Sequence, residues 1–87
     1  MVKYTTSGRV WWMDIKQIFA CNLRRLRQAR KLSQEALAHE AGLDRTYISA
    51  LERCVYAASI TTVADLSRAL GVEPNELLIR SRGDVKG

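Results

Sequence analysis

Two short apolar patterns of helical period meet at Gly42, and their spacing is the strongest constraint on what this chain can fold into. The apolar residues that share one helical face on either side of it are Leu37, Ala38 and Ala41, and then Ile48 and Leu51. Glycine is usual where a helix ends with a positive φ, and Asp44 can cap the following helix through its carboxylate. The stretch 34–53 therefore predicts two short helices joined by a tight turn, with both apolar faces in one core.

The remaining positions of this stretch indicate which surface is left open. Ala38 supplies a short side chain where two steeply crossing helices approach most closely. The residues left on the outer face of the second helix are Arg45, Thr46, Ser49 and Ala50. Short or donor-rich side chains at the start of such a helix suit a DNA groove. The pair is therefore predicted to be a helix-turn-helix whose second helix faces outward.

With these residues the sequence resembles the Cro/C1-type (xenobiotic-response-element, XRE) helix-turn-helix family. The segment Leu43-Asp-Arg-Thr-Tyr-Ile-Ser49 also resembles the recognition segment of restriction-modification controller proteins within that family. The resemblance implies an all-α, compact five-helix domain of the lambda-repressor type. It also implies a sequence-specific transcriptional regulator, a repressor or controller, that binds double-stranded operator DNA without a cofactor.

Length and charge are consistent with such a regulator. A chain of 87 residues forms one small domain whose core gives modest stability when it folds alone, so a homodimer is expected. A formal charge of +5 favours a polyanionic partner. No apolar run has the length of a membrane span, and Cys21 and Cys54 lack a Cys-x-x-Cys spacing. Both thiols are therefore expected to be free in a reducing cytoplasm.

Residues 14–79 are expected to form the domain, between an N-terminal extension (1–13) and a polar tail (80–87). A helical apolar pattern begins at Ile15 and continues to about residue 30. Asp14 precedes it in the place of an N-cap. The first core helix is therefore expected to start at about residue 14.

Residues 1–12 fit no helical period, and two explanations are open. Translation can start naturally at Met13, which would make the preceding residues an upstream reading. Alternatively, the extension is an arm, disordered by itself, that reaches a partner or a DNA groove through Lys3 and Arg9.

The loop 54–59 departs from the charged, proline-containing loop of the resembled family. Val55, Tyr56 and Ala57 form an apolar cluster that can cover the core, contact a dimer partner, or contact a DNA backbone through the tyrosine hydroxyl. Cys54 stands where the resembled family commonly has a glycine. A small loop residue and a redox role are both open for it.

The rest of the chain predicts two more helices. One runs from about Ile60 to Leu70, with Ser59 or Thr62 as its cap and Gly71 as its stop. A short last helix follows in residues 72–78, because proline is accommodated in a first turn. Its apolar end needs cover, so the dimer surface is expected on these last two helices.

Roles on DNA divide by side-chain chemistry. Arg45 has planar, forked donors that match a guanine edge, with Thr46 and Ser49 as neighbouring groove contacts. Ala50 can offer an apolar contact to a thymine methyl group. The residues expected to contact phosphates are Gln34, Tyr47, Arg53 and Arg25.

Arg27 is set apart from the other basic residues of the first helix. Those others, expected to flank the phosphate backbone, are Arg24, Arg25, Arg30 and Lys31. The resemblance implies that Arg27 instead pairs with Glu52, at the end of the recognition helix, in a structural salt bridge.

Another class of function is open beside DNA binding. A protein-interaction module, such as an antitoxin that holds a toxin, often keeps the same DNA-binding domain, and a pull-down would discriminate. An enzyme is not expected, because the chain has one histidine, no plausible carboxylate pair and no glycine-rich phosphate loop. His39 has no second ligand at usable spacing, so no metal site is expected.

Overall fold

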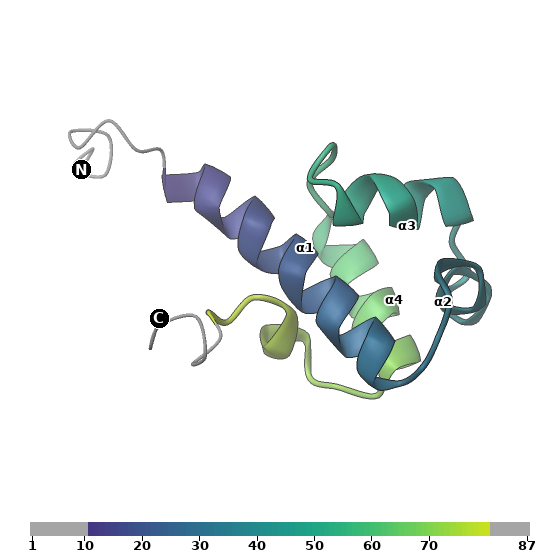
Figure 1. The fold of residues 1–87 in the computed structure, drawn as a ribbon. Helices are drawn as coiled ribbons and strands as arrows, with labels where there is room; N and C mark the ends of the chain where they lie inside the picture. Colours follow the sequence, from purple (N-terminus) through teal and green to yellow (C-terminus); the bar gives the residue numbers. More distant parts are fainter. Residues whose placement is uncertain (1–10, 81–87) are drawn as a thin grey trace.

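The computed structural model describes residues 11–80, and every regular element in that range is helical (Figure 1). The elements in chain order are α1 (Trp11–Ala29), α2 (Gln34–Ala41), α3 (Arg45–Glu52), α4 (Ile60–Leu70) and the 3-10 helix η2 (Pro74–Leu77). The expected all-α fold is confirmed. The arm contacts expected of Lys3 and Arg9 lie outside the described residues.

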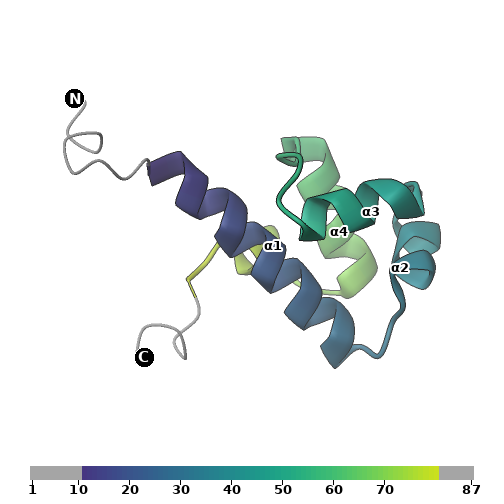
Figure 2. The same ribbon diagram turned by 45° about the horizontal axis from the view of Figure 1, so that its top comes forward.

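The helices pack around one centre. α2 lies against α3 and α4, while α1 lies against α3 on one side and against η2 on the other. Both ribbon views show the first turns of α1 extending beyond the other helices (Figures 1 and 2). The helix-turn-helix formed by α2 and α3 therefore rests on a platform made by α1 and α4.

The core consists of the apolar stripes of these elements. Its buried members are Phe19, Leu23, Leu37, Ala38, Ala41, Ile48, Leu51, Leu66, Ala69, Leu70 and Leu77. Leu37 and Ile48, from the two helices of the motif, are 0% exposed, and Ala38 is 3% exposed. The apolar faces predicted on either side of Gly42 are thus the faces that pack inward.

Two expectations about the ends of the domain were wrong. The fifth helix is a single 3-10 turn, in which Glu76 N–H donates to the carbonyl of Glu73 at 2.9 Å. A proline-led segment of four residues is too short for an α-helical ladder. The first helix begins at Trp11, so Asp14 lies within α1 and is not its N-cap. Once a helix is nucleated, each added residue gains one backbone hydrogen bond, so a packed helix can continue beyond its apolar stripe.

Serine side chains close the N-terminal ends of two helices. Ser33 Oγ accepts the backbone N–H of Ala36 at 2.9 Å, and Ser59 Oγ accepts that of Thr62 at 3.1 Å. Asp44 has the extended backbone of an N-cap but makes no side-chain cap bond. The start of α3 therefore keeps open N–H groups, in contrast to the cap expected from the sequence.

Each α-helix in the described range is followed, within two residues, by a residue with positive φ. Gly42 and Gly71 have φ 72°, whereas Lys31 and Cys54 adopt 58° and 63° without being glycine. The residue after each of them donates its backbone N–H to a carbonyl in the last turn of the helix. Val55, for example, donates to the carbonyl of Ala50 at 2.9 Å. The left-handed conformation of Cys54 explains why glycine suits this position.

Cys54→Gly is expected to raise the free energy of unfolding by about 0.5–1 kcal/mol. The ~1–2 kcal/mol cost of a left-handed non-glycine residue exceeds the ~0.4–1 kcal/mol by which glycine stabilises the unfolded chain. Urea unfolding measures the change. Gly42→Ala is the reverse control, since a Cβ there meets no heavy atom within 4 Å and only φ is strained. A Cys54→Gly protein less stable than the parent would contradict the expectation.

Candidate nucleic-acid interface

The N-terminal half of α3 is the most open part of the helix-turn-helix. Arg45 and Thr46 are exposed, and Ser49 is half-buried. The Thr46 hydroxyl donates to Asp44 Oδ2 at 3.3 Å, and within the described residues no hydrogen bond engages the Arg45 guanidinium. The predicted groove-facing residues Arg45, Thr46 and Ser49 are therefore brought together on one outer surface.

Ala50 does not belong to this surface, contrary to the expectation from the sequence. It is 6% exposed and counts among the buried residues of α3. One turn earlier, Tyr47 packs on Tyr56 of the following loop with ring centroids 6.3 Å apart. The backbone N–H of Val55 also donates to the Ala50 carbonyl at 2.9 Å. The loop thus turns back at this end of α3, and the burial of Ala50 closes it to a thymine methyl group.

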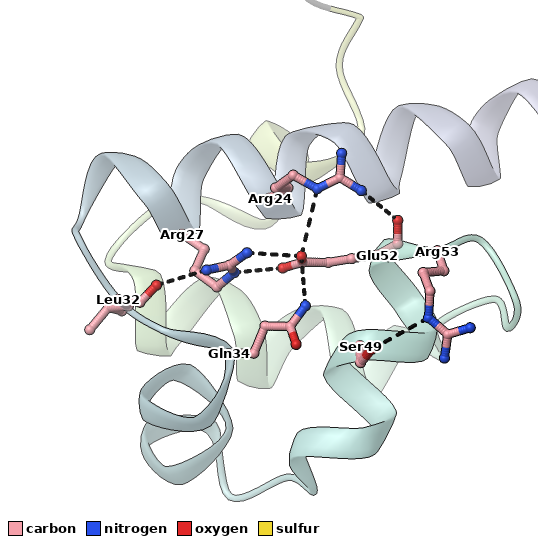
Figure 3. A network of polar contacts seen from close by, with 7 residues as sticks. All are labelled: Arg24, Arg27, Leu32, Gln34, Ser49, Glu52 and Arg53. Atoms are coloured by element: carbon pink, nitrogen blue, oxygen red, sulfur yellow. Dashed lines mark hydrogen bonds and ion pairs between the residues drawn. The ribbon is translucent and has the colours of Figure 1, made fainter.

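The C-terminal end of α3 is held by a buried carboxylate (Figure 3). Arg27 forms a fork on Glu52, with Nε 2.7 Å from Oε2 and Nη2 3.0 Å from Oε1. The two side chains are 12% and 3% exposed. Arg27 also donates through Nη1 to the carbonyl of Leu32 at 2.9 Å. The structure therefore contains the ion pair that the resemblance implied, between α1 and the end of α3.

The hydrogen bonds from Arg27 to Glu52 also affect the pKa of the arginine. They raise the pKa of the Arg27 guanidinium above its ordinary value, more than burial lowers it. An arginine whose folded-state pKa is raised contributes stability below its unfolded pKa and loses it only as pH rises through the higher folded value. Both values are strongly alkaline, so Arg27 keeps its charge throughout the neutral range.

Two further donors surround the same carboxylate. Gln34 Nε2 donates to Glu52 Oε1 at 3.1 Å, and Arg24 donates through Nη2 to the Glu52 carbonyl at 3.0 Å (Figure 3). Arg24 Nε also lies 3.7 Å from Oε1 while the side chain is 48% exposed. The network joins α1, the start of α2 and the end of α3. Gln34, which was expected at a phosphate, directs one of its two amide N–H groups to Glu52.

The other arginines separate into two sets. Arg53 is exposed at the end of α3, where its Nε donates to Ser49 Oγ at 3.4 Å (Figure 3). Arg25 donates to Asn22 Oδ1 at 3.0 Å, on the side of α1 that faces residues 77–79. Arg30 donates to the carbonyl of Leu70 and so caps α4. Arg25 and Arg30 are thus engaged away from α3.

Arg24 was expected only as one of four basic residues that flank the phosphate backbone, and it is the one that lies beside the end of α3. Arg24 and Arg27 are three residues apart on α1, a spacing that puts both on one helical face. Because Arg27 was already expected to reach Glu52, that spacing was a usable signal. The exposed arginines on the recognition helix or directly beside it are therefore Arg24, Arg45 and Arg53.

The cysteine and acidic side chains of the described residues form neither a disulfide nor a metal site. Cys21 is exposed and Cys54 half-buried, and both are free. Among residues 11–80, no three His, Cys, Asp or Glu side chains gather as a metal site would require. No helix in the same range combines the length and apolar character needed to cross a bilayer.

Arg27→Met is expected to lower the free energy of unfolding by about 3 kcal/mol, because it leaves a buried carboxylate with weaker partners. The loss should be at the low end of the range for buried pairs, since Gln34 still donates to the Glu52 carboxylate and Arg24 still lies 3.7 Å from it. The double variant Arg27→Met/Glu52→Leu should recover most of it. Denaturant titration measures all three proteins.

Arg68→Met is the matched control for that experiment. Its ion pair with Asp65 is longer, 3.3 Å against 2.7 Å, and the side chains are 62% and 35% exposed. Breaking it should cost less than about 1 kcal/mol. Equal losses for Arg27→Met and Arg68→Met would show that burial adds nothing to the pair with Glu52.

Comparison with known proteins agrees with this geometry. Residues 23–77 match the family described as Helix-turn-helix. The chain is similar to the control protein C.SmaI of Serratia marcescens, with 42% identity over 82% of this chain and 84% of that protein. It is also similar to the control protein C.BamHI of Bacillus amyloliquefaciens, with 41% identity over 75% and 82% of the two chains.

Solved structures show the same fold. The hypothetical transcription factor NHTF from Neisseria superposes with a TM-score of 0.77, 36% identity and coverage of 83% of both chains. The restriction-modification controller protein C.AhdI from Aeromonas hydrophila gives a TM-score of 0.70 and 44% identity, over 71% of this chain and 94% of that one. The chain therefore belongs to the Cro/C1-type (XRE) helix-turn-helix family of DNA-binding transcriptional regulators.

Proposed function

We propose that this protein is a controller-like regulator that binds its operator as a homodimer, with the N-terminal half of α3 from each protomer in the major groove. The observation that carries the proposal is the division of α3 into two ends. Arg45 and Thr46 are exposed at its start, whereas Glu52 is buried and fully engaged at its end. The core thus holds the helix rigidly while its start is free to meet DNA.

Base recognition is assigned to the exposed donors of α3. The open guanidinium of Arg45 can donate two parallel hydrogen bonds to guanine O6 and N7. Thr46 and Ser49 follow at positions one and four residues later, so they can reach neighbouring base edges. Ala50 is omitted because it is buried.

Phosphate contacts are assigned to groups that border this surface. Arg53, directly after α3, and Arg24, on α1 beside it, are exposed cations. Tyr47 is half-buried and carries a hydroxyl that can donate to a phosphate oxygen. Gln34 has a second amide N–H beyond the one held by Glu52, so the network orients it without using all its donors. Such contacts fix the register of the protein on DNA without reading sequence.

Arg45→Ala and Arg53→Ala are expected to weaken DNA binding in different ways. Losing Arg45 should cost about 1–3 kcal/mol per half-site on the operator, change random-sequence binding less, and relax preference at one base pair. Losing Arg53 should weaken both DNAs alike and lower the salt slope by about one unit for each phosphate that is no longer neutralised. Fluorescence anisotropy over a salt series, on an operator selected from a random pool, measures both. Equal losses for Arg45→Ala on operator and scrambled DNA would refute its reading of sequence.

The homodimer is supported by an apolar face beyond the end of α3. The large hydrophobic residues that remain exposed in the described range are Val55, Tyr56, Ile60, Leu78 and Ile79. They belong to the α3–α4 loop, the start of α4 and the residues after η2. We propose that they form one patch, of the kind that typically marks a protein contact. We call these five residues the apolar face.

This face is compatible with DNA binding by both protomers. It adjoins the C-terminal end of α3, while Arg45 lies at the N-terminal end. A second copy docked there would leave both recognition helices uncovered. In a symmetric dimer the same residues meet from both sides, and two half-sites about one helical turn (~34 Å) apart would be read.

Ile60→Ser is expected to raise the dimer dissociation constant at least about tenfold, because Ile60 is 89% exposed in the protomer and its burial is worth ~1.5–3 kcal/mol. Sedimentation equilibrium at micromolar concentrations measures it. Glu40→Ser, at an exposed position of α2, is the control and should change nothing. A parent protein that stays monomeric and binds one half-site with full affinity would end the proposal.

A further inference from the structure

Asn22 is a buried amide in the middle of α1, and it holds the backbone of residues 77–79. The residue is 2% exposed. Nδ2 donates to the carbonyl of Leu77 at 3.0 Å and to that of Ile79 at 2.8 Å. Oδ1 accepts a hydrogen bond from Arg25 Nη2 at 3.0 Å. Both amide N–H groups are therefore used on backbone 55 and 57 residues away in the chain.

The backbone that Asn22 holds has no other regular support. η2 ends at Leu77, and residues 78–80, called here the C-terminal segment, belong to no helix. One local bond, from Leu78 N–H to the Asn75 carbonyl at 2.9 Å, closes the turn. Leu77 is 0% exposed in the core, but Leu78 and Ile79 are 43% and 49% exposed. The direction in which these two apolar side chains leave the surface thus depends on the two bonds from Asn22.

Leu78 is also one wall of an apolar groove. The groove has a volume of about 80 Å³ and is lined by Ile15, Lys16, Phe19, Ala57, Ala58, Val63 and Leu78. Its other walls come from α1, the α3–α4 loop and α4, which are fixed by helix packing or by the core. Leu78 is the lining residue whose backbone lies outside these elements. The shape of the groove is therefore sensitive to the position of the C-terminal segment.

We propose that Asn22, braced by Arg25, is a positioning residue for self-association, because it sets Leu78 and Ile79 in the surface on which a second copy of this chain docks. This inference rests on the homodimer proposed above. The occupant is a second copy because the groove is continuous with the apolar face through Leu78. An isologous contact there buries the exposed hydrophobic residues of both protomers at once.

The proposal gives Arg25 a role different from a phosphate contact. Its guanidinium braces the oxygen of Asn22, while Arg24, its neighbour in sequence, reaches Glu52 on α3. The positive charge of Arg25 also polarises the amide, which strengthens the two bonds that Nδ2 donates. Loss of Arg25 should therefore weaken the dimer rather than the electrostatic attraction to DNA.

The central experiment compares Asn22→Ala with Ser33→Ala by sedimentation equilibrium. Ser33→Ala removes the cap of α2, so it lowers stability far from the apolar face and serves as the matched control. Urea unfolding shows that both variants are folded under the conditions used. The dimer dissociation constant should rise at least about tenfold for Asn22→Ala and stay within about twofold of the parent for Ser33→Ala. Equal weakening of the dimer by both would overturn the positioning role.

A double-mutant cycle separates positioning from a direct contact. Leu78→Ser should weaken the dimer by itself, because it removes one of the side chains that Asn22 sets. In the Leu78→Ser background, Asn22→Ala should have a clearly smaller effect than in the parent, since coupled residues are not additive. Full additivity of the two changes would overturn the inference.

Arg25→Ala keeps the test decisive if Asn22→Ala does not fold. It leaves both backbone bonds of Asn22 in place, and we expect a weaker dimer with an unchanged salt slope on random DNA. An unchanged dimer with a slope reduced by about one unit would return Arg25 to a phosphate contact. A parent protein that is monomeric would instead refute the homodimer itself, whereas a dimeric parent with an unaffected Asn22→Ala variant refutes only the role of Asn22.

Discussion

The placement of the recognition helix depends on one buried carboxylate, that of Glu52. A carboxylate that is 3% exposed is costly to desolvate unless donors surround it. Here the donors come from outside α3, namely Arg27 on α1 and Gln34 at the start of α2, and Arg24 on α1 adds an ion pair at 3.7 Å. Apolar packing is non-directional and tolerates small rotations of a helix, whereas the fork from Arg27 accepts one orientation. The network therefore fixes how the exposed half of α3 leaves the core.

The helix ends explain how such short helices persist. α2 and α3 have eight residues each, below the length at which an isolated helix is stable in water. α2 is closed at both ends, by Ser33 and Gly42. α3 lacks a side-chain cap at Asp44 and is followed by a strained Cys54, so it depends on its apolar stripe and on Glu52. The helix proposed to read DNA is thus the one held least by local bonds and most by tertiary contacts.

The sequence predicted the features that local spacing determines. It did not predict the burial and partners of side chains that depend on how the helices pack. The all-α fold, the turn at Gly42 and the buried stripes follow from apolar period and turn chemistry. Ala50 looked exposed because its burial depends on how α3 packs in the folded domain, which helical spacing alone does not show. Arg24 and Arg25 are adjacent in sequence, but one reaches Glu52 and the other Asn22. Choosing between them requires the positions of Glu52, 28 residues from Arg24, and of Ile79, 57 residues from Asn22.

In the proposed dimer, recognition and self-association meet at the same helix. Tyr47 belongs to α3 and packs on Tyr56, which belongs to the apolar face. Two half-sites at a fixed separation can be read together only if the path from the dimer contact to each recognition helix is rigid. That path is short here, because it runs from the apolar face through the tyrosine pair into α3. The Glu52 network holds the C-terminal end of the same helix, so a shift at the dimer contact would have to break directional bonds before it could rotate Arg45 out of register.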